Sequence, residues 1–377
     1  MKFKRHTIAA IVISIVLIVG SITTFTVILF NEVTRSTEEN QYFLLEAIVK
    51  SRLKSSEDRV QQLGEIYASM PRVRTLFAEG KRIELYDELS SLYKVQADKY
   101  GIADSHFAIP PATSFLRMRD VKKFGDDLSY KPQVLEVNNQ NVIKKGETLS
   151  RSGPVFYAAV PISDTTGKLV GCVQVDLKFE PVLDKLKATY NIELSLLIKE
   201  KDLKETATAM GGDVINDNNR VGAYIKCHST NWDLMKSLIT DKDVASFDGV
   251  VEPFVREYAK TSYGMLLHPL KDYNGSLFGY IVIASDFSAS RSQAGKTTLM
   301  FITLSVFAVV LLIGVVIIFL RGGLIKPLNM LVSHYKELAE GNKELTIGDT
   351  SKYYSEIKDL AEYYETLRTK DEVQKVS

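Results

Sequence analysis

The sequence predicts an α+β protein in which two tandem α/β modules lie between two membrane-spanning helices and are followed by a helical coiled-coil tail. Three observations predict this fold class. Two long uncharged apolar runs occupy residues 7–30 and 298–320. A hairpin-like motif occurs twice in the segment between them. After the second run, apolar residues are spaced three and four positions apart, as in a coiled coil.

The two apolar runs predict transmembrane helices. Residues 298–320 contain no charge, and at 1.5 Å per residue they reach about 35 Å, more than the roughly 30 Å of a hydrocarbon core. The run at 7–30 follows a short basic segment, residues 1–6. A cleaved signal peptide is the competing interpretation, but the run is too long and no small-x-small site precedes Asn31.

Basic residues at the outer ends of the two runs predict the orientation. Residues 1–6 are basic, and Arg321 and Lys326 follow the second run. The positive-inside rule therefore places both termini in the cytoplasm of a bacterium. We expect a two-pass protein of the inner (cell) membrane, with residues 31–297 periplasmic or extracellular.

Composition and motifs exclude several function classes. The net charge is +1, from 47 basic and 46 acidic residues, which argues against a nucleic-acid partner. No metal-ligand spacing, cofactor motif or catalytic constellation is recognisable, so we expect no metal, no cofactor and no enzyme activity. Cys172 and Cys227 form no CxxC motif, and they are interpreted as small apolar residues rather than as a disulfide.

The segment after the first apolar run predicts helices. Residues 32–62 contain no Gly or Pro and carry apolar residues at helical spacing. Pro71 and Gly80 punctuate the pattern, and a second helical pattern ends before Gly101.

Residues 105–132 combine Pro, aromatic, His, Arg and Asp residues, which favours recognition of a ligand. Arg117 offers a planar donor fork for a carboxylate, His106 offers a donor or acceptor, and Phe115 offers an apolar wall. The alternative for Arg117 is a salt bridge to a neighbouring carboxylate, such as Asp126.

A repeated motif, P-[IL]-x-D-x-x-G-x-L-x-G, begins at Pro161 and again at Pro269, 108 positions later. Each copy lies between apolar, β-rich runs, so each predicts an antiparallel hairpin closed by an Asp/Gly turn. Two such hairpins imply two related α/β modules in tandem. A helix at 180–189 would join them, and a strand at 192–198 would open the second module.

These segments together resemble a double Cache sensory domain of the type with a histidine-bearing SFLR segment, found in bacterial chemoreceptors, sensor kinases and diguanylate cyclases. The resemblance covers roughly residues 31–290 and implies two PAS-like modules, of which the membrane-distal one usually binds the ligand. The tyrosine-rich amino-acid-binding motif of other double Cache receptors is not evident. The residues that carry the resemblance are His106, Pro110, Pro111, Ser114 to Arg117, Gly125 to Leu128, Arg151 and Gly153.

A small carboxylate fits both the resemblance and the positive residues of this segment. Arg117 or Arg151 would anchor it. The expected ligand-binding residues are His106, Phe115, Arg117, Asp126, Arg151, Tyr157 and Asp176.

The cytoplasmic tail resembles a HAMP relay. One apolar seam follows Pro327 and a second begins at Ile357, with Gly341 and Leu345 in the connector between them. Two short amphipathic helices cannot bury such seams alone, so we expect a homodimer that forms a four-helix bundle. Ser355 stands where the resemblance would lead us to expect an acidic residue.

The sequence therefore predicts a homodimeric transmembrane receptor that binds a small extracytoplasmic ligand and relays a conformational change through HAMP, in the manner of a chemoreceptor. One alternative is the sensor part of a histidine kinase or diguanylate cyclase whose catalytic domain, like any cytoplasmic signalling partner, lies outside this chain. Another is a receptor for a protein. The expected boundaries are 1–6 cytoplasmic, 7–30 transmembrane, 31–180 distal module, 181–290 proximal module, 298–320 transmembrane, 321–370 HAMP and 371–377 tail.

Overall fold

The computed structural model describes residues 2–245, 252–351 and 353–373. Met1 and residues 374–377 of the expected tail lie outside the described residues. The chain divides into two compact units, which are treated separately below. One unit is the central segment, residues 36–291, and the other contains the chain on either side of it.

The central unit contains two antiparallel sheets, as the sequence predicts. The first has the strand order β2-β1-β5-β4-β3, and the second has the order β7-β8-β6-β11-β10-β9. The strands of the first sheet are β1 (Ile102–Ile109), β2 (Thr113–Arg117), β3 (Lys144–Ser150), β4 (Gly153–Ser163) and β5 (Leu169–Lys178). Those of the second are β6 (Glu193–Lys199), β7 (Arg220–Val221), β8 (Tyr224–Ser229), β9 (Phe254–Tyr258), β10 (Thr261–Lys271) and β11 (Leu277–Asp286).

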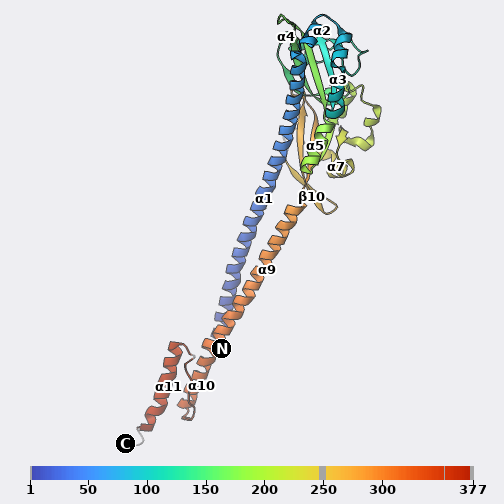
Figure 1. Ribbon diagram of the computed structural model, residues 1–377. Helices are drawn as coiled ribbons and strands as arrows, with labels where there is room; N and C mark the ends of the chain where they lie inside the picture. The colour runs from blue at the N-terminus through green and yellow to red at the C-terminus, as the bar shows by residue number, and fades with distance from the viewer. Residues whose placement is uncertain (1, 246–251, 352, 374–377) are drawn as a thin grey trace. The chain divides into compact units, whose positions relative to one another are not determined.

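A single long helix, α1 (Lys2–Ser69), packs its C-terminal part against both sheets (Figure 1). Val49, Leu53, Val60 and Tyr67 are buried in a core that also contains residues of β1, β4, β5, β6 and β11. The helix that follows Pro71 is separate, and the next one ends at Gly101 in a left-handed conformation, where the sequence predicts the end. These helices are α2 (Pro71–Ala78) and α3 (Arg82–Tyr100).

The other face of each sheet has its own small core. On the first sheet, α4 (Pro132–Gln140) packs Val134 and Val137 against Ala108 and Ala159. On the second sheet, Trp232 and Met235 belong to a separate cluster, and Trp232 is half-buried at its edge. The remaining helices of this unit are α5 (Glu180–Tyr190), α6 (Glu200–Thr206), η1 (Gly212–Val214), η2 (Asp217–Asn219), α7 (Trp232–Leu238) and α8 (Asp241–Ala245).

Both copies of the repeated motif form the predicted hairpins, β4–β5 and β10–β11. In each turn the Asp side chain accepts hydrogen bonds from the backbone N–H groups two and four residues later, at 2.8 and 3.0 Å for Asp164 and at 2.9 and 2.8 Å for Asp272. Gly167 and Gly275 have φ values of +90° and +78°. Only glycine adopts such values without strain, which explains its place in the motif.

The second compact unit contains two helices long and apolar enough to span a membrane, within Ile8–Ser69 and Ser288–Ala339. Thr23 Oγ1 donates to Ser305 Oγ at 2.7 Å, and the rings of Phe30 and Phe301 meet edge to face at 6.0 Å. The two spans therefore pack on each other. The second span is α9 (Ser288–Phe319), and a π-helical segment, η3 (Leu320–Ile325), follows it.

Two helices, α10 (Lys326–Ala339) and α11 (Ser355–Val373), follow the second span. Leu331 of α10 packs against Ile357 and Ala361 of α11, so part of each predicted seam is buried. Leu360 and Leu367, which belong to the second predicted seam, are 44 % and 53 % exposed.

Candidate ligand-binding site

The face of the first sheet that lies opposite α1 carries buried polar side chains. Asp104 and His106 of β1 pair with Asp176 and Gln174 of β5 across the ladder, and His106 also pairs with Arg117 of β2. Residues opposite each other in a ladder point to the same face. All five side chains are at most 9 % exposed. A sheet face that only packs against the core buries apolar residues. The buried polar groups on this face therefore indicate a role other than core packing.

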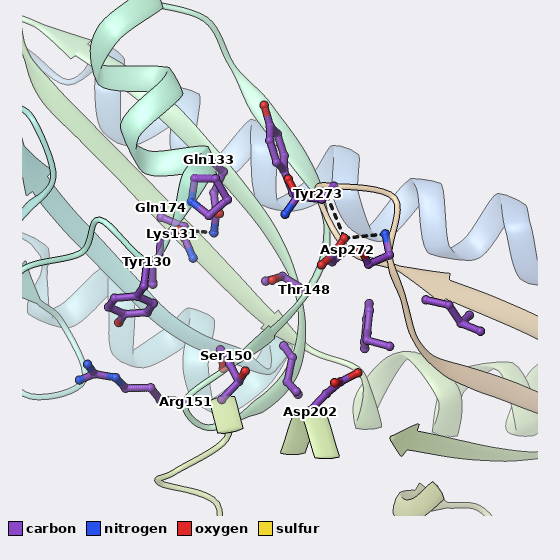
Figure 2. A pocket seen from close by; sticks show the side chains of 17 residues that line it. Tyr130, Lys131, Gln133, Thr148, Ser150, Arg151, Gln174, Asp202, Asp272 and Tyr273 are labelled. Carbon is purple, nitrogen blue, oxygen red and sulfur yellow. Dashed lines mark hydrogen bonds between the residues drawn. The ribbon is translucent and has the colours of Figure 1, made fainter. Parts of the chain in front are cut away.

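Two adjoining cavities open above this polar face. The deeper one, of about 50 Å³, is lined by Asp104, His106, Arg117, Arg119 and Asp176. The wider one, of about 280 Å³, extends towards the second module. Tyr130, Lys131, Ser150 and Arg151 line both cavities, so the two adjoin and are treated as one pocket. Figure 2 shows the wider cavity.

The floor of the pocket holds two carboxyl groups. Burial raises the pKa of both Asp104 and Asp176. Gln174 Nε2 donates to Asp176 Oδ1 at 2.7 Å, and the backbone N–H of Arg119 donates to Asp104 Oδ1 at 3.0 Å. Neither carboxyl has an ion-pair partner among the described residues. The floor can therefore accept hydrogen bonds or a positive charge from a ligand.

His106 lies on the same floor and is neutral. Burial lowers the pKa of His106 well below its usual value, and the nearby charges of Lys131 and Arg117 lower it further. Its Nε2 lies 2.8 Å from Ser114 Oγ. Since one ring nitrogen is engaged by Ser114, the imidazole acts as a fixed polar wall.

Positive side chains form the rim of the pocket. Lys131 is half-buried, stands at the N-cap of α4 and has no ion-pair partner among the described residues. It lines the deeper cavity together with Asp104, His106 and Asp176, which places it near the floor. Arg151 lies over the Tyr130 ring at 5.0 Å. Arg151 Nη1 also lies 3.9 Å from Asp126 Oδ2, which is a long ion pair. Lys131 is therefore free to bind an anionic group, and Arg151 could do so alongside its contact with Asp126.

Arg117 forms the salt bridge that the sequence left as an alternative. Its Nη1 and Nη2 donate to the two carboxylate oxygens of Asp126, each at 2.7 Å, and Nη1 also donates to the carbonyl of Lys123 at 2.8 Å. Arg117 holds the pKa of Asp126 below its usual range. The donor fork of Arg117 is occupied, so this pair holds the loop at 118–127 against β2.

The remaining predicted site residues lie in two places. Tyr157 is buried beside Asp176, on the same face of the sheet, but lines neither cavity. Phe115 lies at a bulge in β2 and packs on Phe77 of α2 at 5.1 Å between ring centroids. Phe115 therefore belongs to the core on the helix side of the sheet.

Several pocket residues were missed by the sequence analysis: Asp104, Arg119, Tyr130, Lys131, Gln133 and Gln174. Gln174 lies between Val173 and Val175, and a polar residue flanked by apolar ones in a strand was the available signal. Asp104, between Ala103 and Ser105, carries only half of that signal. The sequence around Tyr130 and Lys131 contains no such signal, because these residues come to lie over the sheet only through tertiary packing.

Cysteines and histidines elsewhere are structural. Cys172 and Cys227 are free thiols, and burial raises the pKa of each to about 12. His228 Nε2 lies 2.8 Å from Asp184. Within the described residues no group of three potential metal ligands occurs.

Comparisons with known proteins point to a sensory module. The family described as "Double sensory domain of two-component sensor kinase" matches residues 35–290. No curated protein matches the chain at a significant level.

Several solved structures match part of this chain with low identity. The extracellular ligand binding receptor from Desulfohalobium retbaense is 12 % identical with a TM-score of 0.30, over 62 % of this chain and 39 % of that one. A domain ascribed to a sensory box/GGDEF family protein from Vibrio parahaemolyticus is 14 % identical with a TM-score of 0.38, over 67 % and 96 %. The ligand-binding domain of the Campylobacter jejuni chemoreceptor Tlp3 with L-valine is 13 % identical with a TM-score of 0.32, over 72 % and 95 %.

Proposed function

The chain belongs to the dCache_3 family of double sensory domains of two-component sensor kinases, and from that premise we propose that it is a transmembrane receptor for a small polar ligand. The ligand binds in the pocket above the first sheet, in the membrane-distal module. We propose residues 31–180 as the distal module and 181–290 as the proximal module. In this proposal the described part of the chain binds the ligand and relays the signal, and it catalyses no reaction.

One observation carries this proposal: the half-buried Lys131 faces two buried carboxyl groups across a cavity. Burying Asp104 and Asp176 without a cation costs free energy. A protein gains little from such an arrangement unless a ligand completes it. Strongly perturbed titratable groups in a cavity are typical of a functional site.

The chemistry of the pocket favours a ligand with a carboxylate. Lys131 and Arg151 on the rim would bind the carboxylate, and Arg117 supports the pocket through Asp126. Asp104, Asp176 and His106 on the floor would bind a donor group, such as an amine or hydroxyl, at the other end of a short ligand. Tyr157 keeps Asp176 buried, and Phe115 supports β2 from the opposite face.

We further propose that the receptor is a homodimer in the bacterial inner membrane, with both termini cytoplasmic and residues 31–297 outside. The helices α10 and α11, which cover most of residues 321–370 and end at Val373, act as a HAMP relay. Ligand binding needs only a different affinity for two conformations to bias such a relay. The description of the matched family favours a two-component kinase as the output, in this chain's continuation or in a partner.

Thermal unfolding of the full chain in detergent micelles tests the proposal. The panel contains carboxylates, amines and amino acids, with Lys131→Gln and Arg117→Ala measured beside the wild type. A ligand at 100 times its dissociation constant adds about 2.7 kcal/mol, or roughly 5 to 10 °C. We expect a shift with a carboxylate that falls to about half or less in Lys131→Gln at the same ligand concentration. Absence of any shift across the panel would favour a protein ligand instead.

A further inference from the structure

The two turns of the repeated motif share one geometry but have different neighbours. The turn of the distal module, residues 164–168, is held by its own module, because Arg74 of α2 donates to the carbonyls of Ser163, at 2.7 Å, and Asp164. Thr165 and Lys168 of this turn are exposed. The distal turn thus takes no part in the pocket.

The turn of the proximal module, residues 272–276, lies against the distal module. Lys144 of β3 places its ammonium 5.5 Å from the centroid of the Tyr273 ring. Tyr273 is half-buried, whereas Thr165, its counterpart 108 positions earlier, is exposed. Lys199 fixes the base of this turn by donating to the carbonyl of Leu277 at 2.6 Å.

This proximal turn forms a wall of the wider cavity. Asp272, Tyr273, Asn274 and Ser276 line the cavity together with residues of the distal module. Figure 2 shows Asp272 and Tyr273 across the cavity from Lys131 and Tyr130, with Asp202 at another side. The cavity of about 280 Å³ is therefore enclosed only by both modules together.

We propose that the ligand site is composite: a ligand in the wider cavity touches the proximal turn 272–276 as well as Lys131 and Arg151 of the distal module. This inference rests on the proposed function and specifies its ligand class. The ligand is an elongated small molecule with a carboxylate at one end and a cationic or hydrogen-bond-donating group at the other. Asp202 and Asp272, which have no ion-pair partner among the described residues, line the wider cavity and would bind such a donor group of the longer ligand, in addition to the acceptors on the floor.

The composite site explains how occupancy would reach the membrane. From Leu277 in the cavity wall, β11 runs to Asp286, and α9 begins at Ser288. Backbone and side-chain hydrogen bonds of Ser262 with Phe287 and Ser288 join β10 to the start of α9. A displacement of the turn is thus passed along one continuous hairpin to the second span.

The repeat supplies matched controls for the test. The full chain in detergent micelles is titrated with carboxylates and amino acids of graded length, and the thermal shift is measured for each variant against its own unliganded state. Ser276→Trp fills the cavity, and Tyr273→Ala removes a wall. Lys168→Trp and Thr165→Ala are the same changes in the distal turn. We expect apparent Kd to rise about tenfold or more for Ser276→Trp and about threefold for Tyr273→Ala, with both controls unchanged.

A fluorescence reporter keeps the test independent of those two variants. In a Trp232→Phe background, Tyr273→Trp should change its emission on titration with the stabilising compound, and Thr165→Trp should not. If a compound stabilises the wild type, but turn variants equal their controls and the Tyr273→Trp emission is constant, the composite site is overturned and the receptor function stands. If no compound stabilises the wild type, both proposals are overturned.

Discussion

Lys131 stands immediately before the proline that begins α4, and this position determines which charge faces the pocket floor. Pro132 starts the helix at a fixed φ, and the residue before a proline is held out of the helical region. The backbone of Lys131 is accordingly non-helical, with φ −103° and ψ 89°. The side chain thus enters the pocket rather than following the helix surface.

Replacing Lys131 should weaken ligand binding specifically. A charge-assisted hydrogen bond contributes about 1.5 to 3 kcal/mol, so Lys131→Gln should raise Kd for a carboxylate roughly 10- to 100-fold, and Lys131→Arg should retain most of the affinity. Isothermal titration calorimetry measures both. Lys122→Gln, an exposed lysine of the preceding loop, controls for net charge. Equal losses in the two Gln variants would contradict a direct role for Lys131.

The pocket floor should make the unliganded protein sensitive to pH. Because burial raises the pKa of Asp176, the folded state binds its proton more tightly than the unfolded state does. The stability that the protonated Asp176 carboxyl contributes is fully present below its pKa in the unfolded state, about 4. This stability is lost as pH rises towards its pKa in the folded state. Asp176→Asn should therefore remove part of the fall in stability above pH about 4, as measured by unfolding at a series of pH values.

His106 acts in the opposite direction, which separates the two groups. Burial lowers the pKa of His106, so its contribution is lost as pH falls below the unfolded pKa of about 6.5. His106→Gln should reduce only the loss on the acid side of this value. If stability depended on pH in the same way for the wild type and Asp176→Asn, the prediction that the Asp176 carboxyl titrates in the unliganded protein would be wrong.

Only part of the pocket could be predicted from the sequence. His106, Arg117, Arg151 and Asp176 were chosen because their types suit recognition, and they line the pocket. Tyr157 and Phe115 do not. Tyr157 lies on the pocket face but is buried beside Asp176, whereas Phe115 points to the opposite face, because the face to which a strand residue points depends on register. The bulge at Phe115 moves that side chain to the helix side, and a bulge leaves little local signal.

At the scale of the element, the final glycine of the repeated motif allows close strand packing in both modules. A Cβ on Gly171 would lie 2.3 Å from the carbonyl oxygen of Ala108 in β1, and one on Gly279 would lie 2.5 Å from that of Leu197 in β6. In each sheet the hairpin can therefore approach its neighbouring strand only through glycine.

Alanine at either glycine should destabilise its module. We expect Gly171→Ala and Gly279→Ala each to cost about 3 kcal/mol, since a backbone carbonyl cannot move aside easily. Thermal unfolding should show a Tm lower by roughly 6 to 12 °C. Gly211→Ala is the control, because no atom lies within 4 Å of the added carbon. A Tm for both strand variants equal to that of Gly211→Ala would contradict the argument.

Elements with local signals were predicted well. The hairpins were predicted because Asp and Gly at fixed positions specify a turn whatever surrounds them, and α3 ends at Gly101 for the same reason. The order of strands in each sheet was not predicted. In the first sheet β5 inserts between β1 and β4, a crossover that depends on long-range packing.

At the scale of the whole molecule, two helices that could span a membrane flank a module of a sensory family. This arrangement is consistent with a two-pass receptor, and its orientation is a testable proposal. At the base of the unit formed by residues 36–291, side-chain contacts join α1, through which the chain enters the unit, to the start of α9, through which it leaves. Arg291 of α9 donates to both carboxylate oxygens of Glu38 of α1, at 2.6 and 2.9 Å, and Tyr42 packs on Phe287.

Site-directed labelling checks the orientation. In intact cells of a bacterial host, a membrane-impermeant maleimide should label Thr165→Cys and should leave Ser351→Cys unlabelled until the cells are lysed. Both positions are exposed, whereas Cys172 is buried and Cys227 is half-buried, so the wild type provides the background. Labelling of Ser351→Cys in intact cells would contradict the proposed orientation of the chain in the membrane.

The 108-residue repeat has an evolutionary consequence. Duplication of one hairpin within a single gene would account for both copies of the motif. After duplication, natural selection could not replace Gly171 or Gly279, because the neighbouring carbonyl leaves no room for a methyl group. Other positions of the turn differ between the two copies. Thr165 corresponds to Tyr273, and Lys168 corresponds to Ser276. New ligand preferences in related receptors should therefore arise first at those variable turn positions, while the hairpin scaffold stays unchanged.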